Sequence, residues 1–112
     1  MQTNYIGSKR TLVAVIDGEI DHHSAAVCRQ KIDSEFLKTR AVNIIFDFSK
    51  LKFMDSSGIG LIMGRYKLIK PLGGRVILAG VSPQLDRLIS ISGIYKIAHW
   101  AKDTNEALAK MQ

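Results

Sequence analysis

The stretch FMDSSGIG, from Phe53 to Gly60, decides the fold because it joins a strand to a helix within a few residues. At its centre are three small polar residues, Asp55, Ser56 and Ser57, where the first turn of a helix exposes unsatisfied backbone N–H donors. All three are good helix caps, so the stretch predicts at least a well-capped helix.

A cap requires only one of these side chains, which leaves a second hydroxyl group free. If Asp55 or Ser56 is the cap, Ser57 is expected to project into solvent from the first or second helical position. Gly58 and Gly60 flank this position and remove side-chain cover. A phosphate on Ser57 would gain from the helix dipole and would add about −1.5 to −2 charges. Ser57 is therefore a candidate modification site at the centre of a binding surface.

A second unusual feature of this helix is a stripe without side chains. Gly60 and Gly64 are four residues apart and lie on one face, with Leu61 and Leu68 beside them. Each glycine costs about 0.5–1 kcal/mol relative to alanine in a helix. Two explanations are open: the preceding helix packs closely against the stripe, or a partner protein does. The apolar Leu61 beside a modifiable serine favours a partner.

Strands and helices alternate on both sides of this stretch. Apolar runs rich in β-branched residues predict strands at residues 12–16, 42–48 and 75–80, with weaker candidates at 97–100 and at an edge, 4–8. Helical spacing and capping residues predict helices at 21–38, 57–72, 82–93 and 104–111. This order favours an α/β layered fold with right-handed crossovers.

The composition places the chain among ordinary globular domains. Its 112 residues are 46% hydrophobic and 23% charged, which predicts one domain over residues 1–112. We expect no membrane span and no secretory signal. The lone Cys28 cannot form an internal disulfide and is expected in the core, which fits a cytoplasmic protein.

The sequence gives little support to several other function classes. The net charge of +6 is spread along the chain and aromatic residues are few, so a nucleic-acid partner is not expected. The glycine spacing fits neither the dinucleotide fingerprint nor the Walker pattern. The adjacent His22 and His23 lack the spacing of a metal-ligand pair, so we expect no metal. Because no other catalytic or cofactor motif is found, we also expect no cofactor and no catalytic residues.

Five short segments together resemble a known family. They are GEIDHH at 18–23, DSSGIG at 55–60, GRYK at 64–67, VSP at 81–83 and SGIYKI at 92–97. In this order and spacing they resemble the anti-sigma factor antagonists of the STAS-domain family. The paired histidines and the GRYK segment resemble its sporulation branch, whose members act on the anti-sigma factor of sigma factor F.

The resemblance implies a fold and a switching function. The fold would be a single STAS domain with a mixed four- to five-stranded sheet and about four helices, mainly on one side. The function would be partner switching without enzymatic activity. The unmodified protein would bind an anti-sigma factor that is also a serine kinase carrying ATP or ADP, and so free the sigma factor. Phosphorylation would end that binding, and a PP2C-type phosphatase would reverse it.

The resemblance also implies roles for individual residues. The second serine of the motif, Ser57, would accept the phosphate. Asp55 would shape the entry to the helix, and Gly58 and Gly60 would let the kinase approach the backbone. Asp21 matches a family position near the partner's nucleotide. The full expected partner-binding set is Asp21, Asp55, Ser56, Ser57, Gly58, Gly60, Leu61 and Gly64.

Two other functions remain open from the sequence. One is a STAS regulator of another anti-sigma kinase, for example in a general stress pathway. The other is a basic module that binds a small ligand or nucleic acid, with salt-sensitive or saturable binding that survives changes at Ser57.

Overall fold

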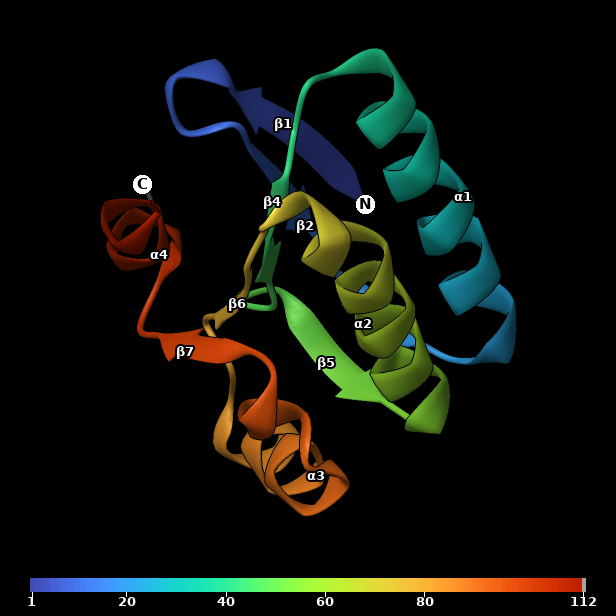
Figure 1. Cartoon of the computed structure of the whole chain (residues 1–112). Helices are drawn as coiled ribbons and strands as arrows, with labels where there is room; N and C mark the ends of the chain where they lie inside the picture. The colour runs from blue at the N-terminus through green and yellow to red at the C-terminus, as the bar shows by residue number, and fades with distance from the viewer. Residues whose placement is uncertain (112) are drawn as a thin grey trace.

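The computed structural model describes residues 1–111 and has a mixed five-stranded sheet in the order β1-β2-β4-β6-β7 (Figure 1). The edge strand β1 pairs antiparallel with β2, and the other pairs are parallel. The strands of this sheet are β1 (Gln2–Ile6), β2 (Thr11–Val15), β4 (Asn43–Asp47), β6 (Val76–Ala79) and β7 (His99–Ala101). All five strands were expected from the sequence, but the bounds of the two weaker candidates differ. The edge strand was expected at 4–8 and ends at Ile6, where a 3₁₀ turn (Gly7–Lys9) follows, and the last strand was expected at 97–100 and begins at His99.

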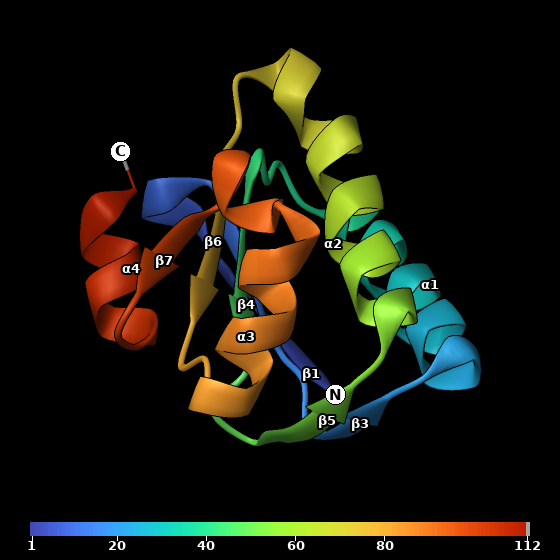
Figure 2. The same cartoon turned by 90° about the horizontal axis from the view of Figure 1, so that it is seen from below.

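Four α-helices accompany the sheet, as expected, and three of them share one face. They are α1 (His22–Lys38), α2 (Ser56–Ile69), α3 (Pro83–Ser92) and α4 (Thr104–Lys110). The main core lies between the sheet and α1, α2 and α3, and contains Ile32, Ile62 and Ile89 from these helices. Figure 2 shows α4 on the opposite side of the sheet from α1 and α2. A smaller core on this face includes Ala107 of α4 and Ile77 of β6.

The helix boundaries follow their local chemistry. Ser82 caps α3 by accepting a hydrogen bond from the N–H of Leu85, and Pro83 occupies the first helical position. Gly93 ends α3 with a φ of 84°, a conformation that suits glycine. The second expected helix is shorter than predicted as an α-helix, because a 3₁₀ turn (Lys70–Leu72) with Pro71 follows Ile69.

Two short strands were not anticipated. β3 (Gly18–Ile20) and β5 (Leu51–Met54) form a separate parallel pair. Each strand is too short to show the alternation of apolar and polar residues that identifies a strand, and Gly18 has a φ of 73°. This pair leads directly into α1 and α2 and therefore positions the candidate site.

Candidate functional site

The β3–β5 pair brings the starts of α1 and α2 together. Ile20 lies opposite Met54, and the backbone N–H of Asp55 donates to the carbonyl of Ile20 at 3.1 Å. The next residues along the two strands, Asp21 and Asp55, are the caps of α1 and α2. Figure 2 shows the two strands side by side below the helices that they enter. Residues far apart in sequence thus meet at one end of a helix pair.

Asp55, not a serine, caps α2. Its Oδ1 accepts a hydrogen bond of 2.8 Å from the N–H of Ser57, and its backbone is extended, as is usual for a cap. Ser56 is the first helical residue and is exposed, whereas Ser57 is the second and is half-buried. The expectation that Ser57 projects freely into solvent was therefore wrong in part. Within residues 1–111, no side-chain hydrogen bond engages the Ser57 hydroxyl.

Asp21 caps α1, in agreement with the sequence prediction. Its carboxylate accepts from the N–H of Ser24 at 2.9 Å, and the Ser24 hydroxyl accepts from the N–H of Asp21 at 2.9 Å. The hydrogen bonds from Ser24 lower the pKa of Asp21, which is exposed. Asp21 therefore already has a structural role at this end of the helix pair, next to Asp55.

Ser57 lies in a hollow of about 460 Å³ between α1 and α2, called here the Ser57 groove. Gly60 and Gly64 also line it, and a Cβ atom added to either would meet nothing within 4 Å. Close approach of α1 was one of the two explanations for the glycine stripe, and this open space contradicts it. The complete lining is His22, Ala25, Ala26, Arg29, Ser57, Gly60, Leu61, Gly64 and Arg65.

Two expected partner-binding residues belong to the interior instead. Gly58 is buried, and a Cβ atom there would overlap the side chain of Met54. Leu61 is only 4% exposed, although it contributes to the floor of the Ser57 groove. The structure therefore corrects the idea that Gly58 opens the backbone to a kinase, because this glycine makes room for Met54 in the core.

An ion pair fixes α2 to α1 beside the groove. The Nε atom of Arg65 lies 3.0 Å from Oδ1 of Asp33, and the Arg65 side chain is 8% exposed. Burial lowers the pKa of Arg65, and the charge of Asp33 opposes this change. The sequence prediction missed both residues, although Arg65 follows Leu61 by four positions and so shares its buried face.

The charged residues that line the groove have one sign. Arg29 and Arg65 are cationic, the Arg65 charge is paired with Asp33, and no carboxylate belongs to the lining. The N-terminal N–H groups of α2 add positive partial charge near Ser57. The surroundings of Ser57 therefore suit an anionic group.

Other candidate chemistry is limited in the described part of the chain. Cys28 is buried, as expected, and burial raises the pKa of its thiol, so it stays a weak nucleophile. Residues 1–111 contain no group of three or more histidine, cysteine or acidic side chains placed to share a metal ion. Within the same residues, no helix has the length and apolarity needed to cross a membrane.

Fold and sequence together define the class. The model of the STAS domain matches residues 2–107, so the chain belongs to the STAS domain family. Within this family it is placed among the anti-sigma factor antagonists. It is 36% identical over 101 residues to the anti-sigma F factor antagonist of Paenibacillus polymyxa, which covers 90% of this chain and 86% of that one.

Solved structures agree with this assignment. The anti-sigma factor antagonist SpoIIAA in its unphosphorylated form is 30% identical, with a TM-score of 0.76 over 96% of this chain and 93% of the other. The Bacillus cell fate determinant SpoIIAA in the phosphorylated form is 33% identical, with a TM-score of 0.71 over 93% of each chain. The expected family and fold are thereby confirmed.

Proposed function

We propose that this protein is a phosphorylation-switched antagonist in which Ser57 is the residue that is switched. In the unmodified state it binds an anti-sigma factor that is also a serine kinase, and so releases sigma factor F for sporulation transcription. Phosphate on Ser57 ends that binding. The proposal makes the protein a regulatory binding protein of the cytoplasm, without catalysis of its own.

The observation that carries the proposal is the position of Ser57. Its hydroxyl has no protein partner within residues 1–111, lies at the second residue of α2 and opens into the Ser57 groove. Asp55 already satisfies the N–H of Ser57, so the helix does not need the hydroxyl. A kinase can modify this serine without removing a structural contact.

The electrostatics explain why the modification would switch binding instead of unfolding the helix. A phosphate would add about −1.5 to −2 charges beside the positive end of α2. Arg29 lines the same groove and would further favour the anion, whereas the charge of Arg65 is already paired with Asp33. The fold would therefore tolerate the phosphate, whereas a partner that fits the neutral serine would meet a bulky, charged group.

The groove suggests how the partner contacts the protein. Gly60 and Gly64 leave open space that a partner can enter, and Ser56 is exposed beside them. Asp21 would lie at the edge of the contact, near the partner's bound ATP or ADP, and Asp55 would shape the entry to α2. Gly58 and Leu61 would support it from below, because both are buried. A PP2C-type phosphatase would reset the switch.

Two relatives of known structure support the phosphorylation of Ser57. One relative of known structure is described in a phosphorylated form and another in an unphosphorylated form, and both share the fold of this chain. The relative from Paenibacillus polymyxa is named for the anti-sigma F factor, which favours the sporulation pathway over a general stress pathway.

Titration of variants against the purified anti-sigma kinase tests the proposal. We expect Ser57→Asp to lose binding and Ser57→Ala to bind without being released by ATP. Ser90→Asp provides the matched control, because Ser90 is exposed on α3, away from the groove lining. Tight binding by Ser57→Asp would remove the switch, and loss of binding by Ser90→Asp would show that added charge alone explains the result.

A further inference from the structure

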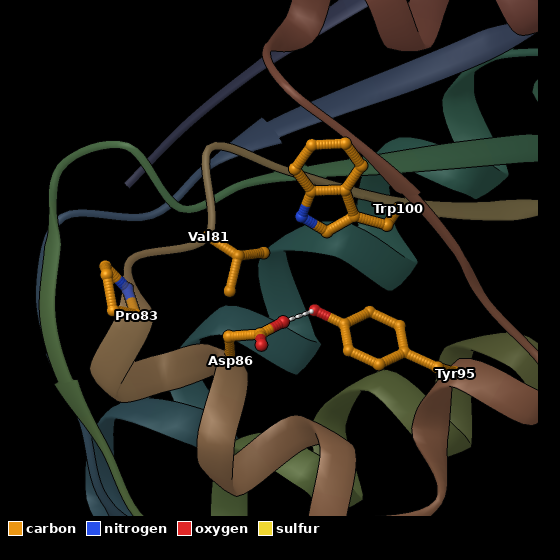
Figure 3. A pocket seen from close by; sticks show the side chains of 5 residues that line it. All are labelled: Val81, Pro83, Asp86, Tyr95 and Trp100. Atoms are coloured by element: carbon orange, nitrogen blue, oxygen red, sulfur yellow. Dashed lines mark hydrogen bonds between the residues drawn. The ribbon is translucent and has the colours of Figure 1, made fainter.

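A second hollow lies between α3 and the edge strand β7, away from the Ser57 groove between α1 and α2. It has a volume of about 440 Å³ and shares no lining residue with the Ser57 groove. Its walls come from the loop after β6, from α3, from the 3₁₀ turn η3 (Ile94–Lys96) and from β7. The lining residues are Val81, Pro83, Asp86, Tyr95 and Trp100 (Figure 3).

The hollow combines aromatic surface with a single carboxylate. Trp100 is 48% exposed, although its register partner Leu78 is fully buried in the main core. Asp86 is the only ionisable carboxylate in the lining. Its exposed neighbours Arg87 and Lys96 do not belong to the lining, so no basic side chain of residues 1–111 lines the hollow.

The carboxylate of Asp86 is held in place by one hydrogen bond, which engages only one of its two oxygen atoms. The Tyr95 hydroxyl donates to Oδ1 of Asp86 at 2.6 Å. Burial raises the pKa of Tyr95 and the hydrogen bond to Asp86 raises it further, so the phenol remains a donor. Within residues 1–111, no ion pair involves Asp86, and no hydrogen bond uses its Oδ2.

We propose that this hollow binds an arginine side chain of a protein partner, with the guanidinium group against Trp100 and paired with Asp86. A guanidinium is planar, stacks on aromatic faces and donates to carboxylates in a fixed geometry. The arginine belongs to a polypeptide because the hollow is open and lies at the edge of the sheet. Such a hollow can cover one side chain, whereas a small-molecule site encloses most of its ligand. This site is independent of the Ser57 switch.

The sole tryptophan makes the test direct. Trp100 gives the only indole N–H signal in a ¹H–¹⁵N spectrum of the whole chain. We expect N-acetyl-arginine amide to shift this signal in a saturable way. The uncharged isostere N-acetyl-citrulline amide should not, and N-acetyl-lysine amide should bind more weakly. Equal responses to arginine and citrulline, equal responses to arginine and lysine, or no response to arginine would each overturn the proposal.

Variants separate binding from folding. Asp86→Asn keeps an acceptor for Tyr95 but removes the charge, and should weaken arginine binding about tenfold. Glu19→Gln is the matched control, because it removes an exposed carboxylate on β3, outside the hollow, and should change nothing. Unchanged affinity in Asp86→Asn contradicts the assignment. Binding of free guanidinium chloride as tightly as of the arginine compound contradicts a protein source.

Discussion

The N–H of Asp55 donates to the carbonyl of Ile20 at 3.1 Å, and this one bond joins the residues that precede the two helices of the site. It continues the ladder of β3 and β5, two strands that stand apart from the main sheet. Because of this pairing, the caps Asp21 and Asp55 and the acceptor candidate Ser57 share one end of the molecule. The small sheet therefore has a role in positioning the site.

The glycine stripe gives a prediction that separates stability from binding. Gly60→Ala and Gly64→Ala should each stabilise the fold by about 0.5–1 kcal/mol, since alanine favours a helix and the added Cβ meets open space. Both should weaken binding to the anti-sigma kinase, because the methyl group enters the Ser57 groove. Chemical denaturation and titration measure the two effects. Full binding by both variants would exclude the stripe from the interface.

Gly58→Ala should behave in the opposite way. The added Cβ would overlap the side chain of Met54, which is buried. We therefore expect the free energy of unfolding to fall by about 1–2 kcal/mol, although alanine has the better helix propensity. A double variant with Met54→Ala should lose less than the sum of the two single variants, because the smaller side chain makes room. Strict additivity in denaturation experiments would show that Met54 is not the obstacle.

Most elements of the fold, but not the small β3–β5 sheet, were predicted from the sequence. The inner strands β2, β4 and β6 were predictable because each overlaps a clear apolar run, and clear caps such as Ser82 and Asp21 mark the helices, whereas β1 and β7 were only weaker candidates. The pair β3–β5 was not predictable, because each strand is short, includes a charged residue and is not part of a longer apolar run. The choice of Ser57 as the acceptor came from local chemistry and stays a prediction, whereas the roles of Gly58 and Arg65 depend on tertiary neighbours that spacing does not reveal.

The ion pair between Arg65 and Asp33 should contribute to the stability of the fold mainly because it keeps the buried charge of Arg65 paired. Asp33→Ala leaves the guanidinium of Arg65 without its partner, and we expect a loss of about 1–3 kcal/mol, reduced because Asp33 is 37% exposed. Arg65→Met in the same background should recover much of this loss by filling the space with apolar atoms. If the double variant is less stable than Asp33→Ala, the unpaired charge is not the cause. Urea denaturation measures all three proteins.

Asp47 should make part of the stability depend on pH. Burial alone would raise the pKa of Asp47, but hydrogen bonds from Ser49 and Thr104 lower it below the ordinary value of 3.8. A lowered folded-state pKa contributes stability that is present above 3.8 and is lost as the pH falls through the folded value. Thr104→Val should therefore lose stability at neutral pH and less at about pH 2. Equal losses at both pH values would contradict this role.

The most direct measurement of the central claim is intact-mass analysis with peptide mapping after incubation with the anti-sigma kinase and ATP. We expect a single phosphate on Ser57, none in Ser57→Ala, and normal modification in Ser56→Ala, since Ser56 is neither the cap nor the proposed acceptor. A phosphate on Ser56, or none from a kinase that is active on a control substrate, would contradict the account.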